Sequence, residues 1–266
     1  MSPRRLPCGS RKNASGIMGS LALSHMSMSD DEELREHIYA TAETWVDNPF
    51  TSLLGVSLTF AHLATQPNHH PEIPAMLARS SILHAVFALE CAANSCIAVL
   101  PKQTRLRDQA EKWEPLDKFD LFLLSLPHQP NLPRGDKIVQ HVRELIKIRN
   151  DYVHPRTRHH PIQNERDERS QPVFSISIQG SALLDIPSMP MTWNAEDAKR
   201  AIAAVVDFLR LYFVEVCHFA PSQITKTLFT MIESPEGHRV ANTSKLNLQK
   251  LGQSLGLDLS FLGASK

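Results

Sequence analysis

Cysteine, glycine and aromatic residues are all scarce in this chain of 266 residues. The four cysteines include no C-x-x-C pair, which argues against a disulfide framework or a zinc site and favours a reducing, cytoplasmic setting. The 10 glycines form no phosphate-binding loop, which argues against a kinase or a dinucleotide enzyme. Aromatic residues make up only 6 % of the chain, whereas alanine and leucine are plentiful. The composition therefore favours a helical protein.

The chain also lacks net charge and long apolar runs. Lys and Arg total 28, as do Asp and Glu, so any contact with a polyanion must come from a local patch. The longest run without these four residue types is Asn48–Pro71, and it is broken by Pro49, Gly55 and His62. We therefore expect no transmembrane helix and no membrane partner.

Capping residues and prolines divide the chain into helical segments. Predicted helices cover about Asp30–Asn48, 50–66, Ala75–Leu100, Leu116–Leu126, Asp136–Val153 and a long segment capped by Asn194. Lys102–Glu114 is either a short helix or a linker. Because Arg79 and Glu90 are its only charges, the Ala75–Leu100 helix is expected to be the buried helix of a bundle.

One short segment has the alternation of a strand. Phe174, Ile176 and Ile178 alternate with serines, and a second strand near Leu183–Ile186 would complete a hairpin at about residues 173–187. Arg156–Pro172 is predicted to be a loop. We expect a disordered basic tail over residues 1–29, a helical domain over 30–219, and a C-terminal extension with short helices over 220–266.

Arg149 occupies an apolar position of its predicted helix. On a helical wheel it shares a stripe with Ile138, Val142, Leu145 and Tyr152. A buried arginine is costly unless it is paired. Glu90, the only acid of the apolar helix, can supply the carboxylate, and Asn94 lies one turn further on. Either Glu90 and Asn94 orient Arg149 for chemistry from the facing helix, or Glu90 and Arg149 form a plain buried ion pair that fixes the register of two helices.

His154 follows Arg149 by five residues. On a continuous helix the two side chains would lie about 140° apart. Pro155 should end the helix and free His154 to swing back or to face a second subunit. Arginine and histidine together suit phosphate chemistry without a metal, because one stabilises negative charge and the other moves protons. An ordinary histidine at a helix end is the alternative.

We expect no cofactor or metal, since His69-His70 and His159-His160 have no acid or cysteine at ligand spacing.

The run Arg149–Pro155 resembles the Arg-x4–6-His motif of HEPN domains. Phe87–Asn94 resembles the acid-bearing helix of that family, and Trp193–Ile202 resembles the start of its last helix. The likeness covers roughly residues 75–215. It implies a mainly α, HEPN-like antiparallel helical bundle that forms homodimers, with a small β-hairpin insertion in this chain.

The resemblance also implies an activity. Catalytic members of the family are metal-independent endoribonucleases in which the 2′-hydroxyl attacks the adjacent phosphate. Carried over, Arg149 would stabilise the phosphorane, His154 would transfer protons and Asn150 would hydrogen-bond the substrate or the partner. A role as a toxin or antiviral defence effector, with an antitoxin or regulatory protein, follows only by resemblance. Some family toxins carry a modified tyrosine at the position of Arg156, so that regulation is not supported here.

A local basic patch surrounds the motif. Residues 134–160 hold seven Lys or Arg against three acids. Lys147, Arg156 and Arg158 are therefore candidates for contact with RNA phosphates, although a solvated helix face would look the same. A non-catalytic, HEPN-like module that binds RNA or protein is the second functional hypothesis.

Overall fold

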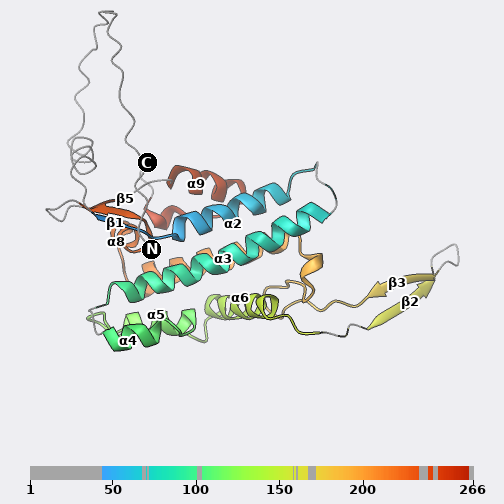
Figure 1. Cartoon of the computed structure of the whole chain (residues 1–266), viewed down its shortest axis with the longest axis horizontal. Coiled ribbons are helices and arrows are strands. Elements are labelled where there is room, and N and C mark those ends of the chain that lie inside the picture. The colour runs from blue at the N-terminus through green and yellow to red at the C-terminus, as the bar shows by residue number, and fades with distance from the viewer. Residues whose placement is uncertain are drawn as a thin grey trace, which may run out of the picture.

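The computed structural model describes residues 44–67, 70, 72–100, 104–157, 159, 161–166, 172–233, 239–241 and 245–263. They form a mainly α-helical body with two small antiparallel sheets (Figure 1). The prediction of a mainly α fold with a small β-hairpin is confirmed. The basic tail predicted over residues 1–29 lies outside the described residues.

The helices follow the predicted order closely. They are α2 (Phe50–Ala64), α3 (Glu72–Ala98), α4 (Thr104–Ala110), α5 (Pro115–Leu123), α6 (Lys137–Val153), α7 (Ala195–Arg210), α8 (Pro221–Leu228) and α9 (Lys245–Ser254). Three short turns complete them: η1 (Pro190–Thr192), the π-helix η2 (Leu211–Val216) that continues α7, and η3 (Ser260–Leu262). The Lys102–Glu114 segment thus contains a short helix.

The central helix is α3, which packs against α2, α5, α6 and α7 (Figure 1). Its buried side is rich in alanine, which lets neighbouring helices approach closely. Pro74 is tolerated because it lies in the first turn. By length and composition α3 could also cross a membrane, but 61 % of its most apolar window is buried inside the fold.

The ends of α6 and α7 are set by local side chains. The Asp136 carboxylate accepts a hydrogen bond from the Ile138 amide (2.7 Å) and caps the start of α6. The helix ends at Val153, and His154 leaves helical geometry (φ −116°, ψ 69°) before Pro155. Asn194 and Asp197 form a capping box at the start of α7. The predicted boundaries of α6 and the predicted start of α7 are confirmed.

The C-terminal segment belongs to the same core as the bundle. Its buried apolar residues are Ile224, Leu228, Phe229, Met231, Leu248, Leu255, Leu259, Phe261 and Leu262. Helix α9 lies against α2, where a Cβ on Gly55 would meet Leu248 Cδ2 at 3.3 Å. Strand β4 (Met231–Glu233) pairs with β1 (Thr44–Val46) and β5 (Arg239–Ala241). The end of the helix predicted over Asp30–Asn48 is therefore wrong, because Thr44–Val46 is drawn into this sheet; residues 30–43 lie outside the described part.

The hairpin forms with a different partner from the one predicted. Strand β3 (Pro172–Ile176) pairs with β2 (Ile162–Arg166), inside the predicted loop, and not with Leu183–Ile186. The latter segment is a turn joined by a single bridge, Gly180 to Pro187. The Leu183 and Leu184 amides donate to the Glu144 carboxylate of α6, at 3.0 and 2.7 Å, in place of a strand ladder.

Candidate functional site

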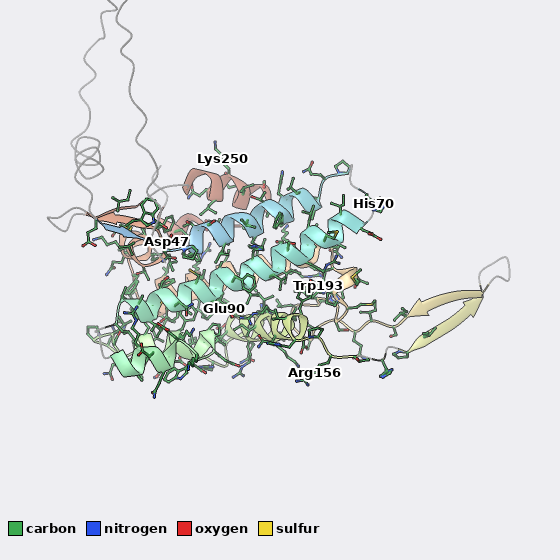
Figure 2. All side chains as sticks on the ribbon, in the orientation of Figure 1. Asp47, His70, Glu90, Arg156, Trp193 and Lys250 are labelled. Carbon is green, nitrogen blue, oxygen red and sulfur yellow. The ribbon has the colours of Figure 1, made fainter. Side chains whose placement is uncertain are left out.

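Arg149 and Glu90 form an ion pair between α6 and α3. Figure 2 shows Glu90 on the side of α3 that faces α6. The pairing predicted from the sequence is confirmed, and neither side chain is far from the surface, at 17 % exposed for Arg149 and 28 % for Glu90. Arg149 Nη2 contacts Glu90 Oε1, and Arg149 Nη1 donates to Asn150 Oδ1 (2.9 Å). The arrangement places a cation and two polar neighbours at the edge of an apolar core.

The guanidinium retains an unused donor. Arg149 Nε is buried and has no hydrogen-bond partner among the described residues. Burial lowers the pKa of Arg149 from its ordinary value, although a guanidinium stays charged at neutral pH. The guanidinium is already paired with the Glu90 carboxylate, and its buried Nε is a further donor that a phosphate oxygen can use only if the side chain moves.

Asn94 does not help to hold Arg149, contrary to the prediction. Its Oδ1 accepts a hydrogen bond from Lys118 Nζ of α5 (2.7 Å), which also donates to the Glu111 carbonyl (2.8 Å). Sequence reasoning missed Lys118, which is only 5 % exposed. A helical wheel indicates that Lys118 lies on the apolar side of its helix, because it is about 40° from the apolar Phe122. Burial lowers the pKa of Lys118.

The depressed pKa of Lys118 predicts a specific pH dependence of stability. Between its folded pKa and the ordinary value of 10.5, the unfolded chain binds more protons, so the free energy of unfolding should rise with pH. We expect the free energy of unfolding of Lys118→Met to lack this rise at alkaline pH. Urea unfolding from pH 7 to 10.5 measures it, with the exposed Lys112→Met as the matched control. Parallel curves for wild type and Lys118→Met would contradict the prediction.

His154 lies outside the Arg149 cluster in the single chain. Its side chain is exposed, whereas Arg149 faces α3. Its backbone amide donates to the Asn150 carbonyl (2.9 Å), and no side-chain hydrogen bond to a described residue restrains the imidazole. The structure therefore brings Glu90, Arg149 and Asn150 together and leaves His154 free to face a second molecule.

The predicted RNA-contacting residues lie near the end of α6. Lys147 and Arg156 are exposed, and Figure 2 shows Arg156 just beyond the last turn. Arg158 lies outside the described residues. At about 100° per residue Lys147 lies about 160° from Arg149 around α6, so it is on the other side of the helix from the Glu90–Arg149 pair. Both exposed cations remain open to a phosphate backbone.

One side of α3 faces outward and was not anticipated by the sequence. We define the outward stripe of α3 by six partly or fully exposed residues between its two ends, which are Met76, Ser80, Leu83, Phe87, Glu90 and Asn94. At about 100° per residue they fall within about 80° of one another. The first half of the stripe is mostly apolar, and the second half holds Glu90 and its ion pair. Phe87 also contacts His84 edge-to-face, with ring centroids 6.0 Å apart.

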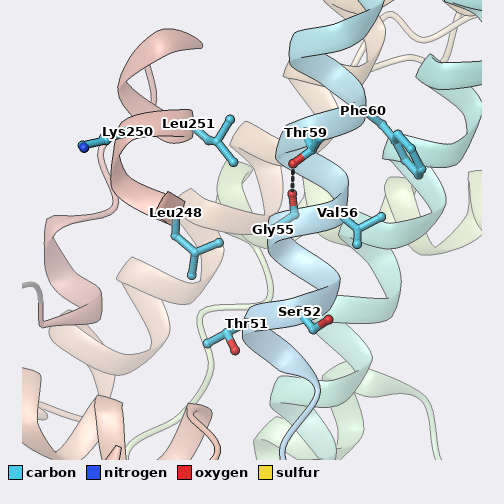
Figure 3. Close-up of a pocket in the computed structure, with 9 residues that line it drawn as sticks. All are labelled: Thr51, Ser52, Gly55, Val56, Thr59, Phe60, Leu248, Lys250 and Leu251. Atoms are coloured by element: carbon cyan, nitrogen blue, oxygen red, sulfur yellow. Dashed lines mark hydrogen bonds between the residues drawn. The ribbon is translucent and has the colours of Figure 1, made fainter. Parts of the chain in front are cut away.

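A groove of about 550 Å³ lies between α2 and α9 (Figure 3), and its lining includes neither Glu90 nor Arg149. It is lined by Thr51, Ser52, Gly55, Val56, Thr59, Phe60, Leu248, Lys250 and Leu251. Thr59 Oγ1 donates to the Gly55 carbonyl (2.8 Å), and Lys250 points away from α2. The lining holds no acid or histidine, so the groove offers no acid–base pair.

Over the described ranges, no group of three or more histidines, cysteines or carboxylates is placed to hold a metal ion. Comparisons with protein-family models, with curated proteins and with solved structures find no match for this chain.

Proposed function

We propose that this protein is a metal-independent endoribonuclease of the HEPN type that acts as a homodimer. The observation that supports the proposal most is Arg149, which is desolvated, is paired with Glu90 and has an Nε with no partner among the described residues. The exposed His154 and the exposed cations Lys147 and Arg156 near the end of the same helix agree with it.

The proposed reaction is a transesterification within the RNA backbone. The 2′-oxygen attacks the adjacent phosphorus as its proton is removed, and the bond from phosphorus to the 5′-oxygen breaks. The leaving oxygen takes up a proton, so the products are a 2′,3′-cyclic phosphate and a 5′-hydroxyl. His154 would carry protons, and Arg149 would stabilise the charge on the non-bridging oxygens.

A dimer is part of the proposal because one chain keeps the two residues apart. Arg149 faces α3, and His154 is exposed at the end of α6. A second copy laid across the outward stripe of α3 would cover its apolar half and bring a His154 towards Glu90 and Arg149. The cleft would then lie between two subunits.

The test is cleavage of a mixed RNA pool by the purified full-length chain in the presence of EDTA. We expect fragments that end in cyclic phosphates and start with 5′-hydroxyls. Cleavage that EDTA abolishes, or that leaves 3′-hydroxyl ends, would overturn the proposed chemistry.

A non-catalytic module for RNA or protein binding is the second candidate. The Glu90–Arg149 pair joins α3 to α6 and would fix their register without any reaction. RNA binding by a folded dimer that leaves the pool intact would favour this reading. A role in toxin–antitoxin pairs or antiviral defence, with an antitoxin or regulatory partner, remains a proposal that depends on the enzymatic one.

A further inference from the structure

The β2–β3 hairpin projects away from the helical body (Figure 1). Ile162 and Ile176 are direct partners across its ladder, and they are 61 % and 47 % exposed. An isolated two-stranded hairpin is at best marginally stable in water, and its edges are open to pairing. The hairpin therefore has the features of an arm that lacks its docking surface.

A second exposed apolar surface lies at the root of this arm. We define the end face as Ile73 and Met76 in the first turns of α3, Val153 at the end of α6 and Met191 in η1. These side chains are 37 %, 54 %, 46 % and 64 % exposed, respectively. Four exposed apolar side chains at one end of the bundle indicate a contact surface.

The elements that carry the end face are held together. Arg79 Nη1 of α3 donates to the Pro190 carbonyl of η1 (3.3 Å). The rings of Tyr152 at the end of α6 and Trp193 after η1 lie 5.7 Å apart, and Trp193 is only 2 % exposed. Met76 also begins the outward stripe of α3 that leads to Glu90. The end face is thus a supported surface, continuous with the proposed dimer interface.

We propose that the hairpin is an exchange arm, which docks the Ile162–Ile176 pair on the end face of a second copy of this chain. Each chain carries the hairpin and the end face at the same end of the bundle. One two-fold axis would therefore place the hairpin of each copy on the end face of the other. Ile162 is the first residue of β2 and Ile176 the last residue of β3, so the pair lies at the root of the hairpin, at the same end of the bundle as the end face. The exposed Arg156 at the arm's root and the exposed Glu72 beside Ile73 have opposite charges. The inference rests on the homodimer of the proposed function.

The first test is the molar mass of the full chain in solution, measured by light scattering. We expect a dimer for the wild type and for Leu124→Asp, a control at an exposed apolar residue of the distant α5 end (62 %). Ile162→Asp/Ile176→Asp and Met76→Asp/Met191→Asp should each weaken dimerisation by about 100-fold or more, because a charge would be buried in an apolar contact. A monomeric wild type, or arm variants that remain dimers, would overturn the inference.

Crosslinking identifies the occupant. When Ile162→Cys in one tagged copy is mixed with Met191→Cys in a differently tagged copy, we expect a disulfide that joins the two chains. Neither variant should form this disulfide when it is mixed with the wild-type chain. A crosslink only within a single chain that carries both cysteines would mean that the arm folds back, and would overturn the exchange. If the arm variants stay dimeric and cleave RNA, the exchange arm is contradicted and the proposed activity is not. If dimerisation requires the arm but the dimer never cleaves RNA, the proposed activity is contradicted and the exchange arm is not.

Discussion

Replacing His154 with alanine should lower RNA cleavage by about 10²–10⁴-fold, the contribution of a positioned acid or base. The free energy of unfolding should not change, because the imidazole is exposed and no side-chain hydrogen bond to a described residue restrains it. Cleavage rates of the mixed pool, with end-group analysis, and the Tm of the same preparations provide both measurements.

His128→Ala is the matched control for this variant. His128 is exposed and lies before the start of α6, at the opposite end of the helix from His154, with its ring 5.7 Å from that of His218. The control should cleave like the wild type. Full activity in His154→Ala would exclude His154 as the proton carrier, and a large drop in its Tm would point to a structural residue.

Subunit mixing tests whether the cleft is shared. If Arg149 of one copy works with His154 of the other, an inactive Arg149→Ala preparation mixed with inactive His154→Ala contains one intact site in each mixed dimer. Random exchange makes half of the dimers mixed, so about a quarter of the wild-type activity should return. No recovery after confirmed exchange would place both residues in one subunit.

The helices were predictable because their signals are local. Asn194 caps its helix through its own side chain, and Pro155 acts on the residue before it. Such effects need no knowledge of distant chain segments. The Glu90–Arg149 pair was predictable for a different reason: a charge on an apolar stripe needs a partner, and α3 offers one acid in its apolar stretch.

The sheets were not predictable because their pairing is long-range. Thr44–Val46 has a partner nearly two hundred positions away, at Met231–Glu233. Strand β3 pairs with the upstream strand β2. In the predicted partner segment, the Leu183 and Leu184 amides donate to Glu144 of α6 and so are not open to β3. The prediction that Asn94 helps to orient Arg149 is wrong for the same reason, since nothing local in the sequence places Lys118 beside Asn94.

Arg149→Ala should lower the free energy of unfolding by about 2 kcal/mol as well as abolishing cleavage. The change leaves the Glu90 carboxylate without its cation in a site where it is only 28 % exposed, and breaking a fully buried pair costs about 3–5 kcal/mol. Urea unfolding measures the loss. Arg134→Ala is the control: its partners Asp117 and Asp120 are 50 % and 38 % exposed, so water can replace the guanidinium at a cost of about 1 kcal/mol or less.

A double variant separates a pair kept for chemistry from one kept for stability. Glu90→Leu/Arg149→Met removes both charges and fills the space with apolar atoms. It should be at least as stable as the wild type, because apolar replacements of buried pairs are often neutral or stabilising. It should also be inactive, because nothing remains to stabilise the phosphorane. An inactive protein of unchanged or higher stability would mean that the fold does not need Arg149 but the reaction does. A double variant as unstable as Arg149→Ala would instead make the pair a structural tie between α3 and α6.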